Sequence, residues 1–256
     1  MKPSPVTRPK SSIKSGDVFE VGRHRLLCGD ATDSKATPRL MGTEKIKLVL
    51  TDPPYGESYV ETKVGFSTRK YQRPIANDAI SDEKSYREFT KGWFGTIKPH
   101  LERKNAFYVF NEKMIFALRD GIHDAGGKLS QLLVWVKTHS VIGRMDYQMQ
   151  HEHIAYGWVG VHEFIKAKDK TILVCPKPSK SVAHPTMKPV TLLRRLILNS
   201  SRAGDVVYDP FAGSGSTGIA AEQTGRRAFM IELDPEYCRV IIERFENTFG
   251  LKAKKV

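Results

Sequence analysis

The chain alternates short, strongly apolar segments with longer amphipathic stretches, and this alternation constrains the fold more than any other feature. The apolar segments have the length of buried strands. Between them, apolar side chains recur at helical spacing, as Tyr86, Phe89 and Trp93 do. Strands that alternate with helices predict an α/β fold with a largely parallel sheet. The expected strands are residues 25–28, 47–51, 106–110, 131–136, 154–158, 206–209 and 228–232.

Charge is the property of the composition that bears most on function. The 256 residues include 41 lysines and arginines against 28 acidic residues, which gives a formal net charge of +13. That excess predicts a polyanionic partner, most commonly nucleic acid. Three cysteines without a CxxC spacing exclude a disulfide framework and the common zinc spacings. Because neither a signal-peptide core nor an apolar run of about 18 residues is found, we expect a cytoplasmic protein without membrane contact.

The expected organisation is a single domain over residues 16–250, between basic tails at 1–15 and 251–256. Residues 57–77 predict a mobile loop, and residues from about 138 to 183 predict a small insert for target recognition. Basic and aromatic side chains in both regions suit contacts to nucleic acid, although a solvated loop fits 57–77 as well. The candidate DNA-binding residues are Lys63, Arg69, Lys70, Arg73, Arg144 and Tyr147.

Two histidines of the insert, His151 and His153, are spaced by two residues and could chelate a metal. No cysteine or further carboxylate pattern accompanies them in the sequence. We therefore favour histidines that are satisfied by hydrogen bonds within a sheet, and we expect no metal site.

A glycine-rich turn follows the strand expected at 206–209, and a helix begins at about Ser216. Glycines allow a tight bend and close approach of a ligand, and amides at the helix start attract an anionic group. The next strand ends at Glu232, whose carboxylate can accept both hydroxyls of a ribose. Asp209, at the end of the first strand, is unfavourable to a pyrophosphate and favourable to an ammonium group. A nucleoside joined to an amino acid describes S-adenosyl-L-methionine.

The same turn leaves two other interpretations open. Gly213, Gly215 and Gly218 satisfy the GxGxxG pattern, so an NAD-dependent oxidoreductase is an alternative from a different class. The chain continues for only 24 residues after Glu232, so the rest of a dinucleotide domain would have to lie upstream. A simple turn between strand and helix is the remaining alternative.

A second motif, Asp52-Pro53-Pro54-Tyr55, closes the strand expected at 47–51. Two prolines remove two backbone donors and stiffen the turn, which leaves carbonyl oxygens and the Asp52 carboxylate as acceptors. An acceptor-rich site with an aromatic ring suits a planar base that carries an exocyclic NH₂ group. Asp52 and a proline carbonyl would each accept one N–H, and Tyr55 would stack on the ring. A plain turn after the strand is again the alternative.

Together, the two motifs closely resemble those of the DNA amino-methyltransferases, which methylate adenine N6 or cytosine N4. The catalytic motif precedes the cofactor motif, as in the permuted β group of that family. The resemblance extends over roughly residues 23–249 and is closest to compact phage and prophage adenine enzymes. It implies catalytic roles for Asp52, Pro53, Pro54 and Tyr55, with double-stranded DNA as substrate and a homodimer as an open alternative.

The resemblance also implies which residues bind S-adenosyl-L-methionine. Residues 184–189 resemble a segment whose polar groups meet the methionine carboxylate, and residues 27–31 resemble a strand end that touches the adenine. The implied cofactor-binding residues are Asp30, Ala31, Thr186, Lys188, Asp209, Phe211, Gly213, Ser214, Gly215, Ser216, Thr217 and Glu232.

The family implies a fold and a reaction. The expected fold is the Rossmann-like, doubly wound class I methyltransferase fold, whose mainly parallel sheet has seven strands, one of them antiparallel. Ligands bind beyond the carboxyl ends of such strands, so Asp52 and the glycine turn should share one edge. Methyl transfer to the N6 of a flipped-out adenine is the expected activity. Cytosine N4, an RNA base and an inactive DNA-binding module remain alternatives.

Overall fold

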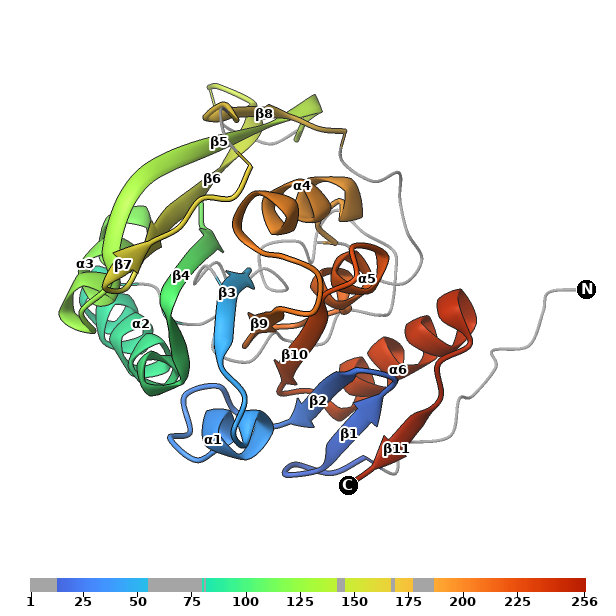
Figure 1. The fold of residues 1–256 in the computed structure, drawn as a ribbon. Helices are drawn as coiled ribbons and strands as arrows, with labels where there is room; N and C mark the ends of the chain where they lie inside the picture. The colour runs from blue at the N-terminus through green and yellow to red at the C-terminus, as the bar shows by residue number, and fades with distance from the viewer. Residues whose placement is uncertain (1–12, 55–79, 81, 142–145, 167–168, 177–186) are drawn as a thin grey trace, which may run out of the picture.

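The computed structural model describes residues 13–54, 80, 82–141, 146–166, 169–176 and 187–256, which form one large mixed sheet between two layers of helices (Figure 1). The strands are β1 (Val18–Val21), β2 (His24–Cys28), β3 (Ile46–Thr51), β4 (Leu101–Phe110), β5 (Lys128–Val141), β6 (Met149–Trp158), β7 (Val161–His162), β8 (Ile172–Val174), β9 (Val206–Asp209), β10 (Arg227–Glu232) and β11 (Ala253–Lys255). The helices are α1 (Ala36–Met41), α2 (Glu83–Ile97), η2 (Lys98–His100), α3 (Ile115–Asp124), α4 (Val190–Ser200), α5 (Ser216–Gln223) and α6 (Pro235–Phe249).

All seven expected strands are present, and they are neighbours in the sheet. The full order is β11-β1-β2-β10-β9-β3-β4-β6-β5-β8, with β7 paired to β4. The predicted strands form the inner run from β2 to β5. Within that run only β6 is antiparallel to its neighbours. The predicted doubly wound, mainly parallel class I methyltransferase fold is therefore confirmed.

The predicted strand count was wrong, because the described residues form eleven strands rather than seven and β1 is also antiparallel to its neighbours. Two of the additions lie at one margin, where β1 pairs with β2 and β11 pairs with β1. Residues 253–255 were expected to be a frayed basic tail, but their backbone pairs with Val21, Glu20 and Phe19. Lysine-rich strands are common at sheet edges because charge there discourages pairing with other chains.

The target-recognition region expected from about residue 138 to 183 is built largely as an extension of the sheet. β5 continues to Val141, β6 begins at Met149, and β8 adds a strand along β5. In Figure 1, β5 and β6 run together as a long curved ribbon with β8 beside it. The expected mobile loop at 57–77 and the N-terminal residues 1–12 lie outside the described residues.

Two hydrophobic clusters cover the two faces of the sheet. One contains Leu192, Ile219 and Ile241, from α4, α5 and α6. The other contains Leu40, Trp93 and Leu118, from α1, α2 and α3. Helices on both faces are what a parallel sheet requires, because its strands are apolar on both sides. The longest described helices, α2 and α6, have 15 residues each, and no described helix is long and apolar enough to cross a bilayer.

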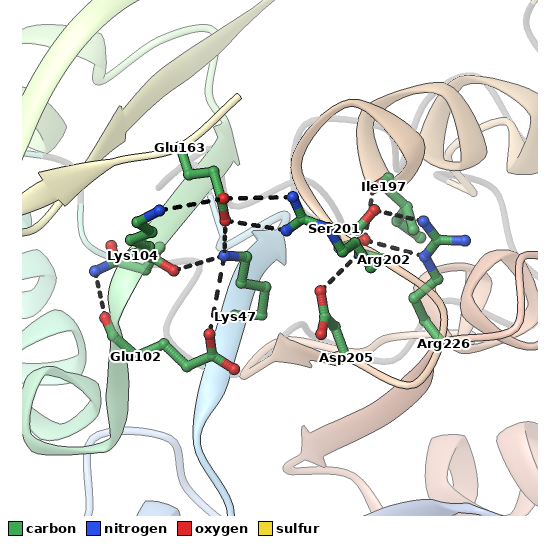
Figure 2. Close-up of polar contacts among 10 residues, drawn as sticks. Lys47, Glu102, Lys104, Glu163, Ile197, Ser201, Arg202, Asp205 and Arg226 are labelled. Atoms are coloured by element: carbon green, nitrogen blue, oxygen red, sulfur yellow. Dashed lines mark hydrogen bonds and ion pairs between the residues drawn. The ribbon is translucent and has the colours of Figure 1, made fainter. Parts of the chain in front are cut away.

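A network of ion pairs closes the amino-terminal edge of the central strands, away from the motifs (Figure 2). The buried Lys47 contacts the carboxylate of Glu163 and donates to the carbonyl of Lys104 at 2.9 Å. Arg202 also donates to Glu163, at 3.2 Å. Hydrogen bonds from Lys47 and Arg202 lower the pKa of Glu163 to about 2. The network ties β3 and β4 to the segment after β7 and to the turn after α4.

Candidate active site

The two motifs meet at the carboxyl-terminal edge of the sheet because β3 and β9 are parallel neighbours. Leu48 pairs with Val207, and Val49 pairs with Tyr208. At the ends of these strands, Thr51 Oγ1 donates to Asp209 Oδ1 at 2.7 Å, across 158 residues of sequence. Asp52 follows Thr51 directly. The structure thus places the Asp52 motif beside the strand that leads into the glycine turn, on one edge of the molecule.

Asp209 is a buried carboxylate at this edge. Its Oδ1 also accepts the backbone N–H of Phe211 at 3.1 Å. Burial raises the pKa of Asp209 to about 6, although hydrogen bonds from Thr51 and Thr217 oppose that rise. The ring of Phe211 packs against Trp93 and Phe89 of α2, with centroids 5.5 and 5.7 Å away. The turn is therefore anchored both in the sheet and in the helical layer.

The glycine turn has the backbone shape that the sequence predicted. Gly213 and Gly215 have φ angles of +52° and +77°, which L side chains rarely adopt. A Cβ on Gly215 would lie 2.9 Å from a side-chain carbon of Ile241, so the turn also needs a glycine to pack against α6. Arg244 of α6 donates to the carbonyl and the hydroxyl of Ser214, and so braces the outer side of the turn.

Glu232, at the end of β10, is bound to the glycine turn. Its Oε2 accepts the N–H of Gly213 at 2.7 Å, and its Oε1 accepts the N–H of Asp234 at 2.9 Å. Burial raises the pKa of Glu232 to about 7. Each carboxylate oxygen has a second acceptor position, so both could still receive a ribose hydroxyl. With the Gly213 amide committed to Glu232, and the Gly215 amide donating to the Ala212 carbonyl, neither amide serves a phosphate.

The adjacent strand end carries the other predicted cofactor residues. β2 pairs with β10 so that Cys28 lies opposite Glu232, and the Gly29 N–H donates to the Glu232 carbonyl at 2.9 Å. Asp30 follows, and its Oδ1 accepts both the N–H and the hydroxyl of Thr32 at 2.8 Å. Ala31 is buried. Carboxylates therefore mark three neighbouring strand ends, at Asp30, Glu232 and Asp209.

Lys188 is hydrogen-bonded to Asp52. Its Nζ donates to Asp52 Oδ2 at 2.6 Å and lies 3.2 Å from Glu152 Oε2, while Lys137 Nζ lies 2.8 Å from Glu152 Oε1. Burial opposes the charge of Lys188, but Asp52 and Glu152 together raise its pKa. Burial likewise works against the charge of Glu152, but Lys188 and Lys137 hold its pKa below the ordinary value. The result is a charge-balanced chain of four side chains from four parts of the sequence.

The remaining predicted site residues fall into three groups: described residues in or next to the two motifs, Tyr147, and residues outside the described part of the chain. Pro53, which is buried, and Pro54, which is half-buried, directly follow Asp52. Ser214, Ser216 and Thr217 are buried in or just after the glycine turn. Tyr147 is 90% exposed between β5 and β6, and no described contact links it to the edge. The other predicted residues lie outside the described part of the chain: Tyr55, Lys63, Arg69, Lys70, Arg73, Arg144 and Thr186.

Sequence reasoning missed Glu152, Lys137, Thr51 and Arg244. Glu152 and Lys137 are charged residues within strands that otherwise pack against the core. Because a buried charge must be paired, their position in apolar strands could have predicted that they interact. Thr51 stands directly before the Asp52 motif at a strand end. Nothing in the sequence around Arg244 connects it to the glycine turn, which lies 30 residues earlier.

The strand order matches the expected class I methyltransferase fold, and solved structures of DNA methyltransferases are similar to the chain. Among solved structures, the chain is similar to the PvuII DNA methyltransferase (cytosine-N4-specific), with a TM-score of 0.69 and 17% identity over 88% of this chain and 87% of that one. It is also similar to the M1.HpyAVI–SAM complex, with a TM-score of 0.63 and 21% identity over 86% of this chain and 98% of that one.

Sequence comparison points to the same kind of protein as the two motifs. Residues 166–243 match the family model described as DNA methylase. A curated relative, the type II methyltransferase M2.DpnII of Streptococcus pneumoniae, is 26% identical over 80% of this chain and 84% of its own length. These matches support the resemblance to the DNA amino-methyltransferases that the two motifs indicated.

Proposed function

We propose that this enzyme transfers a methyl group from S-adenosyl-L-methionine to the exocyclic N6 of adenine in double-stranded DNA. The observation that carries the proposal is the pairing of β3 with β9, which brings Asp52 to the strand that opens the glycine turn. An acceptor for an amine and a turn suited to a nucleoside then share one edge. Adenine is the favoured base because aspartate at position 52 resembles the adenine enzymes more than the cytosine enzymes, which more often carry serine there.

The residues of the edge fit this cofactor. Glu232 offers acceptor positions for a ribose, and its raised pKa follows from burial at the point where a neutral sugar would bind. Asp209 provides a carboxylate near the turn for an ammonium group. When bound, S-adenosyl-L-methionine supplies a methyl group that is already activated on a sulfonium. The chain therefore needs to position the two reactants, which can lower a barrier by about 7–11 kcal/mol.

Asp52 is proposed to hold the target amine. The exocyclic nitrogen cannot be reached inside a duplex, so the base must be flipped out at a cost of a few kcal/mol. Pro53 and Pro54 offer carbonyls without competing N–H groups, and Asp52 accepts an N–H of the amine. Transfer would join the methyl group to the nitrogen and leave the donor as a neutral thioether, and the surplus N–H proton would pass along its hydrogen bond to Asp52 and from there to water. The ammonium of Lys188 donates to Asp52 Oδ2, and Asp52 Oδ1 would accept an N–H of that amine.

We propose that Lys188 positions the carboxylate of Asp52. This role is additional to the one near the methionine carboxylate that the family resemblance implies. Its ammonium is one hydrogen bond from Asp52 and in contact with Glu152. The lysine also lies 5.1 Å from the centre of the Phe110 ring, at the end of β4. It therefore stands between the base-holding motif and β6, where it can fix the direction in which the Asp52 carboxylate points.

The first prediction concerns Asp52. We expect Asp52→Ala to abolish methylation and to leave cofactor binding intact, because Asp52 faces the acceptor base rather than the glycine turn. Transfer of a tritiated methyl group to DNA measures the activity, and calorimetry with S-adenosylhomocysteine measures the binding. Asp52→Asn, which keeps the shape, should also lose most of the activity. Near-normal transfer by either variant would refute the role.

The identity of the base is tested separately. DNA methylated by the wild-type enzyme is digested to nucleosides, and the modified nucleoside is identified by its mass. N6-methyladenine supports the proposal, whereas N4-methylcytosine supports the alternative with the same chemistry. A parallel reaction with RNA tests the remaining acceptor, and a thermal shift with S-adenosylhomocysteine against NAD tests the oxidoreductase alternative.

The proposal also includes a cytoplasmic location, because the substrate is DNA and the thiols of Cys28, Cys175 and Cys238 are free. A homodimer belongs to the same proposal, since the family resemblance allows one. Sedimentation velocity at assay concentration separates a dimer from a monomer.

A further inference from the structure

A carboxylate and two histidines lie close together on the face of β6 away from Lys188. They lie beside the carboxyl-terminal edge of the sheet that carries the candidate active site, which we call the active-site edge. His151 and His153 alternate with Glu152 along the strand, so the two imidazoles lie on one side and Glu152 on the other. Glu112 follows the end of β4, the strand paired with β6. The three residues each offer one ligand atom, and these atoms all lie within 4.8 Å of one another.

The spacing of these atoms suits a metal ion. His153 Nδ1 lies 3.3 Å from Glu112 Oε2, and His151 Nε2 lies 3.7 Å from Glu112 Oε1. Donors bound to zinc at about 2.0–2.1 Å with tetrahedral angles are separated by about 3.3–3.4 Å. One pair already has that separation, and the three ligand atoms lie within 4.8 Å of one another.

Two further observations point to a ligand at this cluster. The buried Nδ1 of His153 makes no hydrogen bond among the described residues, although buried polar atoms rarely lack one; its 3.3 Å approach to Glu112 Oε2 is an ion-pair contact only if the imidazole is protonated. Glu112 Oε2 accepts the backbone N–H of His153 at 3.0 Å, which fixes the carboxylate beside that ring. Metal-binding carboxylates are commonly held by such a second hydrogen bond.

We propose that Glu112, His151 and His153 form a binding site for a divalent transition-metal ion of the zinc type. Two imidazoles and a carboxylate favour zinc, cobalt or nickel over magnesium and calcium, which prefer oxygen ligands. Three protein ligands leave at least one coordination position for water or another group. The ion would stiffen the part of β6 that presents Glu152 to Lys188, so the site supports the active-site edge without taking part in methyl transfer.

The test is direct metal binding by the full chain. Protein treated with a chelator and dialysed is titrated with Zn²⁺ in a calorimeter, and separately with Co²⁺, whose visible absorption reports tetrahedral nitrogen and oxygen ligands. We expect one ion per chain with micromolar or tighter affinity. Glu112→Gln, His151→Ala and His153→Ala should each weaken binding at least about tenfold. His139→Ala, which changes an exposed histidine of β5 outside the cluster, should leave it unchanged.

Circular dichroism of the metal-free variants shows whether each one folds. If His153→Ala does not fold, Glu112→Gln decides the question, because it keeps the size of the side chain. Absence of one-to-one binding by the wild type would overturn the proposal. Binding that all three substitutions leave unchanged would overturn it as well, because the ion would then lie elsewhere. Neither result would affect the proposed methylation, which is assayed with chelator-treated protein.

Discussion

Individual side chains at the active-site edge are held by partners from distant parts of the chain. Asp52 is bound by Lys188, Lys188 contacts Glu152, and Glu152 in turn contacts Lys137. A buried charge is costly unless it is paired, so removal of one member leaves its neighbour uncompensated. This arrangement explains how a buried lysine can remain charged beside the aspartate that is proposed to hold the substrate amine.

The second prediction concerns Glu152 as a positioning residue. We expect Glu152→Gln to lower kcat by about ten- to a hundredfold, or about 1.4–2.7 kcal/mol, because Lys188 would no longer be held in place. The KM for S-adenosyl-L-methionine should change less than kcat, since no contact among the described residues joins Glu152 to the glycine turn and Glu152 could affect the cofactor only through Lys188. Glu152→Asp should restore part of the activity. Glu243→Gln on α6, with a side chain 45% exposed, is the matched control. An unchanged kcat would exclude this role.

The third prediction concerns pH and Glu232. Its pKa is raised to about 7, so the native carboxyl holds its proton more tightly than the unfolded one, and its contribution to stability falls as pH rises from about 4.5 to about 7. Ribose hydroxyls would donate hydrogen bonds to the ionised Glu232 carboxylate. We therefore expect the affinity for S-adenosylhomocysteine to increase as the pH rises through about 7. Calorimetry across that range measures the change. Glu232→Gln should flatten the profile, and an equally steep profile in that variant would assign the titration to another group.

At the scale of elements, close contact between strands places the residues of the site. β6 lies between β4 and β5, and at Gly157 the neighbouring strands leave no room for a side chain. A Cβ there would lie 1.9 Å from the backbone oxygen of Lys128 and 2.5 Å from the Phe107 ring. The glycine therefore permits the β4–β6–β5 register that carries His151, Glu152 and His153 to the active-site edge.

The fourth prediction compares two glycines. We expect Gly157→Ala to destabilise the fold by at least about 1–3 kcal/mol, because backbone as well as side-chain atoms must move. Gly92→Ala, on the exposed face of α2 with open space around it, should stabilise by about 0.5–1 kcal/mol. Urea unfolding of both variants gives the two values. Equal stabilities for the variants would contradict the packing argument.

At the scale of the whole molecule, the acidic residues of the active-site edge and the overall positive charge suit two different ligands, the methyl donor and DNA. The chain has a net charge of +13, yet the described active-site edge gathers Asp30, Asp52, Asp209 and Glu232, of which Asp52 is paired with Lys188. An acidic edge suits a positively charged donor, while the excess of lysine and arginine elsewhere suits a phosphate backbone. The ion-pair network around Lys47 lies at the opposite edge of the sheet, where it joins strands and turns of the protein to one another (Figure 2).

The fifth prediction follows from that charge. DNA affinity should fall steeply with salt, and an enzyme that neutralises about six phosphates would lose about 10³ in affinity between about 50 and 200 mM. Affinity for S-adenosylhomocysteine should be almost unaffected, because its contacts involve few exchanged ions. Fluorescence anisotropy with labelled duplex DNA measures the first quantity and calorimetry the second. DNA binding that is insensitive to salt would mean that the basic surface does not contact the backbone.

The sequence by itself determined the inner seven strands, the α/β class and the two motifs. These are local properties: an apolar run of strand length, prolines that remove donors and glycines that permit positive φ are all visible within a few residues. Only the tertiary structure decided which side chains meet. Glu112 reaches His153 across 41 residues, and Lys188 reaches Asp52 across 136, because sheet order rather than chain order sets these distances. The outer strand β11 was likewise decided by the tertiary structure, because its three residues are a strand through pairing with β1.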